Sequence, residues 1–191
     1  MGKTLREVFN NHPELRTDRL FARYCRAFEE VLLMAVKMNH LNPKRLNLED
    51  VYLMDGVIET IDGRTLFYYD AEYSNDKGLF TEDGKFKHRT VHVPIEKGSY
   101  FQNFHSSFYI RGNIERVLVL RDIAILDAIK QGHYEYDVTC KHGCERVVEE
   151  QRDFISVHTW SAISRRHLKV VATKNWIKAV KEMGGLTLWL T

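Results

Sequence analysis

The stretch LMDGVIETIDGRTLFYYDAEYS, residues 53–74, contains the strongest indication of the fold in this sequence. Two runs rich in β-branched, aliphatic and aromatic residues flank the dipeptide Asp62-Gly63. Such a dipeptide between two such runs predicts a β-hairpin with a two-residue turn, because that turn needs positive φ at both positions. If these two residues form the turn, the register of the hairpin places Asp55 opposite Asp70.

This register gathers three carboxylates. Because side chains alternate along a strand, Glu72 lies on the same face as Asp70. Opposed Cβ atoms are then about 5 Å apart and diagonal ones about 7 Å apart. Unless lysines or arginines surround them, carboxylates at this distance either raise the pKa of at least one member or bind a divalent cation. Mg²⁺ fits such a site, because it needs only one or two carboxylates. The alternative is a solvent-exposed acidic face, against which Leu66 and Tyr68 on the same face argue.

The rest of the chain predicts one α+β (α/β) domain over residues 1–191. Of the 191 residues, 44% are hydrophobic and 28% charged, which is enough to bury a core and excludes a disordered tail. Apolar residues at helical spacing predict helices at residues 18–38, 123–131 and 173–183. Strands are predicted at residues 51–61, 64–74, 88–94, 104–110, 116–122, 133–140 and 153–160. We expect a central mixed β-sheet with antiparallel hairpins, flanked by helices.

The spacing of the acids resembles the PD-(D/E)XK nuclease superfamily. An acid near the end of one strand is followed, about fifteen residues later, by a strand with two acids separated by one residue. Asp55 corresponds to the first acid, and Asp70-Ala71-Glu72 to the second motif. The resemblance implies a restriction-endonuclease-like fold. Residues 18–160 would form its nuclease-like core, and residues 161–191 a basic C-terminal helix and strand.

The sequence departs from this superfamily at two positions. The motif lysine belongs two residues after the second acid, where Glu72 or Ser74 stands instead, and Met54 precedes the first acid where proline is usual. Of the lysines nearest downstream, Lys97 is favoured because it directly follows a predicted strand. The three candidates are Lys85, Lys87 and Lys97. Because of the missing lysine, a catalytically inactive nuclease-like domain that binds nucleic acid or a protein partner remains the alternative.

The resemblance implies an endonuclease that hydrolyses DNA phosphodiester bonds with Mg²⁺ or Mn²⁺. Asp55, Asp70 and Glu72 would hold the metal ion, which polarises the phosphate and lowers the pKa of a bound water. Lys97 would stabilise the developing charge. His92 is a candidate general base or phosphate contact, because histidine has a near-neutral pKa, with a hydrogen-bonded histidine on a half-exposed strand as the alternative.

Charge is distributed unevenly along the chain. The formal net charge is +2, yet residues 151–191 carry seven basic and two acidic residues. A basic helix face beside an acidic metal centre suits the phosphate backbone of a nucleic acid, for which we expect DNA; a solvated helix face is the alternative. The candidate nucleic-acid-binding residues are Arg165, Arg166, Lys169, Lys174, Lys178 and Lys181.

The three cysteines are too few for a disulfide framework and favour a reducing, cytoplasmic setting. This would be the cytoplasm of a host cell if a phage encodes the protein, since the closely spaced strands over residues 88–122 resemble small phage-encoded proteins. No apolar run approaches the roughly 20 residues that span a bilayer, so no membrane partner is expected, and a homodimer is left open.

Two further interpretations remain. The CKHGC sequence, residues 140–144, predicts a tight hairpin rather than a zinc site, because a structural zinc needs four ligands. A redox couple of its two cysteines has the wrong spacing for a thiol oxidoreductase. A histidine-based chemistry on His88, His92 and His158 is the remaining alternative.

Overall fold

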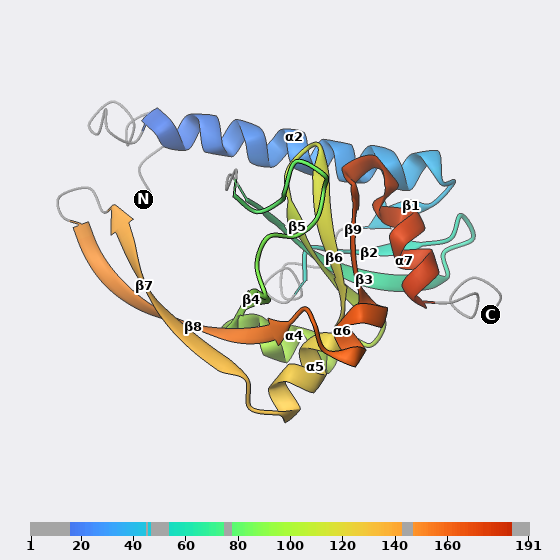
Figure 1. Cartoon of the computed structure of the whole chain (residues 1–191). Coiled ribbons are helices and arrows are strands. Elements are labelled where there is room, and N and C mark those ends of the chain that lie inside the picture. Colours follow the sequence, from blue (N-terminus) through green and yellow to red (C-terminus); the bar gives the residue numbers. More distant parts are fainter. Residues whose placement is uncertain (1–15, 45, 47–53, 75–77, 143–146, 185–191) are drawn as a thin grey trace.

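Groups of one to four strands are separated by helices along the chain (Figure 1). The computed structural model describes residues 16–44, 46, 54–74, 78–142 and 147–184. The helical elements are α2 (Arg16–Met38), η2 (Ile95–Lys97), α4 (Gly98–Asn103), α5 (Asp122–Lys130), α6 (Ala162–His167), η3 (Thr173–Asn175) and α7 (Trp176–Gly184), where η marks a 3₁₀ turn. The strands are β1 (Asn42–Lys44), β2 (Gly56–Glu59), β3 (Thr65–Tyr73), β4 (Thr90–Pro94), β5 (Ser107–Gly112), β6 (Arg116–Arg121), β7 (Tyr134–His142), β8 (Val147–His158) and β9 (Leu168–Ala172).

The strands form two sheets. The larger sheet has six strands in the order β1-β2-β3-β5-β6-β9, and all its neighbouring strands are antiparallel except β3 and β5. The smaller sheet is antiparallel, in the order β4-β8-β7. The predicted α+β class with a mixed central sheet flanked by helices is confirmed. The restriction-endonuclease-like topology stays a prediction.

The β2–β3 hairpin has the predicted register in its outer part. Gly56 pairs with Tyr69 and Val57 with Tyr68, which continues to Asp55 opposite the next residue of β3. The backbone N–H of Asp55 donates to the carbonyl of Tyr69 at 3.1 Å, so the chain still follows β3 there.

The turn of this hairpin differs from the prediction. The N–H of Thr60 donates to the carbonyl of Arg64 at 2.8 Å, so the loop contains three residues rather than two. Gly63 takes a φ of 87°, the left-handed conformation that completes such a loop. A three-residue loop alone would shift the register by one residue.

A bulge at Leu66 restores the register. Ile58 pairs with Phe67 but Glu59 pairs with Thr65, so Leu66 is the extra residue in β3. Leu66 and Phe67 are therefore both buried in the core against α2 and α7. The expectation that Leu66 shares a face with the carboxylates is wrong, because the bulge turns it to the opposite face.

Two cores lie on opposite faces of the six-stranded sheet. On one face, α2 and α7 bury apolar residues against β3, β5 and β6, with Leu32 and Trp176 among the most buried. On the other face, α4, α5 and the smaller sheet pack against β5 and β6 through residues such as Phe101, Leu118 and Ile155. The second core contains residues from both sheets and therefore joins them.

The predicted helices are present as α2, α5 and η3 followed by α7. Residues 51–53 of the first predicted strand lie outside the described residues, and β2 begins at Gly56. Strands β7 and β8 pair as expected and extend away from the rest of the molecule (Figure 1), whereas the tip of the CKHGC turn lies outside the described residues. The short α4 and α6 and the edge strand β9 were not predicted individually. No helix in the described part of the chain is long and apolar enough to cross a membrane.

Candidate active site

Strand β3 carries Asp70 and Glu72 on the face of the sheet that is turned away from helix α7. Tyr69, which precedes Asp70 on the strand, packs its ring against Trp176 of α7, with a centroid distance of 5.6 Å. Alternation along the strand therefore turns Asp70 and Glu72 to the face of the smaller sheet. Asp70 is 5% exposed, so its carboxylate is among the few buried charged groups of the described residues.

Lys97 reaches these carboxylates from the segment that follows β4. Its Nζ atom lies 2.5 Å from Oδ2 of Asp70 and 3.9 Å from Oε2 of Glu72. The lysine side chain is largely buried, and the ammonium group lies 5.6 Å from the centre of the Tyr109 ring. Of the three lysines considered from the sequence, Lys97 is the one at the carboxylates. Lys85 instead pairs with Asp83 at 3.1 Å, while Lys87 is exposed.

The position of Lys97 depends on a tight passage of the backbone. Strand β4 ends at Pro94, the short turn η2 follows, and α4 begins at Gly98. A Cβ atom at Gly98 would lie 3.1 Å from Cδ1 of Ile155 on β8, so only glycine fits here without displacing its neighbour. The close approach brings the backbone next to Lys97 against the second core.

Asp55 is held at the point where the pairing of β2 with β3 ends. Its Oδ2 atom accepts a hydrogen bond from the backbone N–H of Ala71 at 2.7 Å. The side chain thus satisfies a donor of β3 that β2 does not reach. This bond fixes the Asp55 carboxylate beside the residue that lies between Asp70 and Glu72.

Two residues of β5 complete the surroundings of the carboxylates. The hydroxyl of the buried Tyr109 donates to Oε2 of Glu72 at 2.6 Å. Arg111 lies beside Glu72 in the backbone register of the parallel strands β3 and β5. Its Nη1 atom donates to the carbonyl of His92 at 3.5 Å. Its buried Nε atom has no hydrogen-bond partner within the described part of the chain.

Burial and mutual repulsion control the ionisation of the two aspartates. Burial raises the pKa of Asp70 to about 6; Lys97 opposes this increase, and the charges of Asp55 and Glu72 add to it. The pKa of Asp55 is also raised, first by desolvation, although its carboxylate is open to water on one side. The hydrogen bond from Ala71 opposes that rise.

Lys97 and Tyr109 keep their protons at neutral pH. Burial disfavours the charge on Lys97, but Asp70, Glu72 and Asp55 together outweigh this effect, so the pKa of the lysine is raised. Burial raises the pKa of Tyr109 well above its usual value, and the negative charge of Glu72 adds to this shift. The site therefore presents one cationic donor and one neutral hydroxyl donor to its carboxylates.

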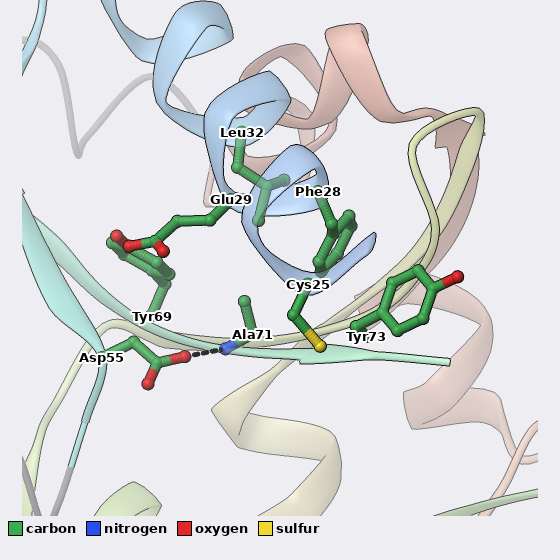
Figure 2. Close-up of a pocket in the computed structure, with 8 residues that line it drawn as sticks. All are labelled: Cys25, Phe28, Glu29, Leu32, Asp55, Tyr69, Ala71 and Tyr73. Atoms are coloured by element: carbon green, nitrogen blue, oxygen red, sulfur yellow. Dashed lines mark hydrogen bonds between the residues drawn. The ribbon is translucent and has the colours of Figure 1, made fainter. Parts of the chain in front are cut away.

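A pocket of about 400 Å³ opens beside Asp55, between α2 and β3 (Figure 2). Figure 2 shows Phe28, Glu29 and Leu32 of α2 over Asp55 and Ala71, with Asp55 at one end of the pocket. The negative charge of Glu29 contributes to the raised pKa of Asp55, as does that of Glu72. Asp55 thus connects the carboxylates around Lys97 with this pocket.

The donor set is chemically suited to Mg²⁺, although a cation already lies against it. Among the residues that the structure describes, no three His, Cys, Asp or Glu side chains form a group arranged to hold a metal ion. The carboxylate oxygens of Asp55, Asp70 and Glu72 are nevertheless the ligand type that Mg²⁺ and Mn²⁺ prefer. Lys97 Nζ lies between Asp70 and Glu72, so a metal ion on both would have to displace the ammonium group.

The structure places the His92 side chain away from these groups. Its Nε2 atom lies 2.6 Å from Oε2 of Glu135, and its ring stacks on Phe154 on the open face of the smaller sheet. His88 packs edge-on against Phe86. The three histidines considered from the sequence therefore contact different partners. For His92 the interpretation as a hydrogen-bonded histidine on a half-exposed strand fits better than that of a base beside the carboxylates.

The basic C-terminal residues do not line the carboxylates. Helix α7 carries Lys178 and Lys181 and packs on the face of the sheet opposite Asp70. Lys169 on β9 forms an ion pair with Glu182. The exposed cations of this segment are Arg165 and Arg166 on α6, Lys174 on η3 and Lys178 on α7. The expectation that a basic helix face lies beside the acidic centre is not met, because α7 buries its apolar side on the other face of the sheet.

Sequence reasoning missed Glu29, Arg111 and Glu135 as neighbours of functional groups. Alternation in the strand that contains Tyr109 and Arg111 places these two on one face, but only the parallel pairing of β3 with β5 brings them to Glu72. No signal in the sequence indicates that pairing.

No family model matches this chain, and no curated protein or solved structure matches it either.

Proposed function

We propose that this protein is a metal-dependent endonuclease of the PD-(D/E)XK type that hydrolyses DNA phosphodiester bonds. The observation that supports this most is the position of Lys97, 2.5 Å from Asp70 and 3.9 Å from Glu72. The sequence motif lacks its lysine two residues after the second acid. In the structure Lys97, from the η2 turn that follows β4, lies at the same carboxylates. The combination of acids and lysine that this chemistry needs is therefore present despite the degenerate motif.

Each residue of the site has a role in this proposal. Asp55, Asp70 and Glu72 would hold Mg²⁺ or Mn²⁺, which when bound polarises the phosphate and supplies a water of lowered pKa. Lys97 is charged at neutral pH and donates to a phosphate oxygen, where it stabilises negative charge that develops during hydrolysis. Tyr109 holds the Glu72 carboxylate in one orientation through its hydroxyl.

The exposed cations of α6, η3 and α7 are proposed to bind the DNA backbone at a distance from the chemistry. Their charges attract phosphates and release counterions without reading sequence. A nuclease of this kind would act in the cytoplasm, that of a host cell if a phage encodes it.

A second candidate is a nuclease-like domain that binds nucleic acid or a protein partner without cleaving. A specific observation favours it: the carboxylates are already satisfied within the protein. Lys97 pairs with Asp70 and Glu72, and Tyr109 donates to Glu72. A carboxylate that is paired in this way binds a metal ion only if it gives up part of that pairing.

The test is cleavage by the purified chain of residues 1–191. Plasmid and oligonucleotide DNA are incubated with Mg²⁺, with Mn²⁺ or with a chelator. We expect cleavage that requires the metal and that falls by a factor of about 100 or more in Asp70→Ala and in Lys97→Ala, as is typical when one charged group of a catalytic site is removed. Lys85→Ala is the matched control, because Lys85 is an exposed lysine of the same region whose partner is Asp83.

The two candidates differ in clear outcomes. Metal-dependent cleavage that Asp70→Ala leaves unchanged contradicts the assigned site. DNA binding without cleavage under any metal condition supports the binding domain instead. Cleavage abolished in Lys97→Ala but kept in Lys85→Ala supports the nuclease and assigns its lysine.

A further inference from the structure

Three aromatic rings form a column at the end of β8. The rings of His133 and His158 are 4.1 Å apart and inclined by 22°, and those of His158 and Trp160 are 5.2 Å apart and inclined by 17°. Trp160 is 59% exposed. Trp160 therefore keeps most of its surface open to solvent although it stacks on His158. The column thus ends in an open aromatic surface.

The backbone on both sides of Trp160 is fixed. The N–H and the hydroxyl of Thr159 both donate to the carbonyl of Arg89 at 2.9 Å. The hydroxyl oxygen of Ser161 accepts the N–H of Ser164 at 3.1 Å and so caps helix α6. An indole that stacks on His158 and stands on a backbone held on both sides loses little conformational entropy when a ligand stacks on it, which favours binding.

Three exposed arginines belong to the segments that adjoin this column. Arg89 is exposed and its backbone binds Thr159, while Arg165 and Arg166 are exposed on α6, which begins two residues after Trp160. Within the part of the chain that the structure describes, no ion pair engages any of these three guanidinium groups. Arginine side chains without a carboxylate partner are available to bind phosphate.

We propose that the column of His133, His158 and Trp160 is a stacking platform for an unpaired nucleobase, with Arg89, Arg165 and Arg166 binding the phosphates of the same strand. Every base has a π face that continues such a column, and aromatic stacking beside a cationic groove is how single strands are bound without sequence preference. Paired bases hide their faces within the duplex, so the platform selects single-stranded segments. The inference rests on the proposed function only in taking nucleic acid as the ligand, and DNA and RNA strands share the required chemistry.

Binding is measured with the full chain in the presence of a chelator, so that no cleavage occurs. The probes are a fluorescent oligothymidine strand, an oligouridine strand of equal length and a fully paired DNA duplex. We expect Trp160→Ala to weaken binding of the strands about tenfold or more, since a base–aromatic stack contributes about 1–3 kcal/mol, and Trp160→Phe to retain most of the affinity. Ile114→Ala, which removes another exposed hydrophobic residue, serves as the surface control.

These outcomes distinguish base stacking on the platform from a general affinity for nucleic acid. A loss confined to the single strands supports the platform, and the tighter of the two strands identifies its natural source. Equal strand affinity in Trp160→Ala and in the wild-type protein overturns the proposal, as does an equal loss for strand and duplex.

Fluorescence gives a second readout that survives a folding defect of the alanine variant. Stacking of a base on Trp160 quenches indole emission, whereas Trp176 is fully buried and cannot be reached. The third tryptophan, Trp189, lies outside the described residues, so the measurement uses a Trp189→Phe background. We expect the strand to quench this background protein, and the added Trp160→Phe change to abolish that quenching while binding persists. Quenching that persists in Trp160→Phe overturns the platform. Failure of cleavage in the earlier test, with strand binding and quenching intact, would count against the nuclease and leave the platform standing.

Discussion

Asp70 combines burial with a strong dependence on its neighbours. Its pKa is raised to about 6, chiefly by burial, so the carboxylate that would bind the metal is half protonated near that pH. We expect the logarithm of kcat/KM, measured below saturating metal, to rise with unit slope against pH up to about pH 6 and then to level off, because only the ionised form is competent. Glu182→Gln changes an exposed carboxylate and should leave the inflection in place. An inflection near pH 4 would contradict the raised pKa.

The same shift predicts that the site lowers stability. The folded-state pKa of Asp70 exceeds the unfolded value of about 3.9, so its favourable contribution is complete below about pH 4 and is lost as the pH rises through about 6. Asp70→Asn should therefore raise the free energy of unfolding by on the order of 2 kcal/mol at pH 7.5 and by little at pH 4. Thermal unfolding at both values measures this.

Asp62 provides the control for that measurement. It is an exposed carboxylate whose pKa is lowered, first by its hydrogen bond from Thr60. The favourable contribution of Asp62 to folding stability is therefore present above the pKa of the unfolded state and is lost as the pH falls through the lowered folded-state pKa. Asp62→Asn should lower stability slightly at pH 7.5, which is the opposite sign. A stabilising effect of both substitutions would indicate a general effect of removing negative charge rather than the burial of the Asp70 carboxylate.

The carboxylates could be predicted from sequence, whereas most of their partners could not. Hairpin register and alternation are local properties, and they place Asp55, Asp70 and Glu72 together without knowledge of the rest of the fold. The sequence favours Lys97 among three lysines, but its pairing with Asp70 depends on how the second core positions η2. The His92 partner, Glu135, comes from a strand 43 residues away that no local pattern connects with it.

The β2–β3 hairpin keeps the predicted register through two irregularities that compensate one another. The three-residue loop shifts the pairing by one residue, and the bulge at Leu66 shifts it back. Gly63 has a φ of 87°, and nothing lies within 4 Å of a Cβ added there, so substitution costs backbone strain and no clash.

Gly63→Ala should therefore destabilise the protein by about 1–2 kcal/mol, the cost of the left-handed conformation for a residue with a Cβ. Gly63→Asn should cost less, because asparagine tolerates this conformation. Urea unfolding measures both. Cleavage by the folded fraction should be unchanged, because the register at Asp55 follows from the pairs beyond the bulge. Equal destabilisation by both substitutions would contradict a conformational origin.

Other elements differ in how far their patterns determine them. Helix α2 follows from apolar residues at helical spacing, but the buried side differs in part from the predicted one. Phe28 and Ala35 of the predicted stripe are buried, whereas Tyr24 and Met38 are exposed. Leu32 and Val36 are buried instead. The parallel pairing of β3 with β5 requires the chain to pass through β4 and α4 first, and β4 joins the smaller sheet instead. Partner choice between strands depends on the packing of the whole core, so strand sequences alone leave it undetermined.

Across the whole molecule, the carboxylates and the basic helix α7 occupy opposite faces of the six-stranded sheet. We therefore expect Lys174→Ala combined with Lys178→Ala to weaken DNA affinity and to reduce its dependence on salt, by about one unit of slope for each phosphate that the variant no longer neutralises. The single-turnover cleavage rate at saturating DNA should be unchanged. A lower rate at saturation would place these lysines at the chemistry, in contradiction to the packing of α7.

The proposed lysine and its carboxylates belong to different sheets. Lys97 follows β4 of the smaller sheet, and Asp70 lies on β3 of the larger one. Catalysis would then require the two sheets to be docked, and a partial opening between them would disassemble the site while most hydrogen bonds of the backbone persist. In a urea titration, cleavage should disappear at a lower denaturant concentration than the far-ultraviolet circular dichroism signal, so that activity reports the docking of the smaller sheet. Coincident transitions would mean that the sheets unfold as one cooperative unit.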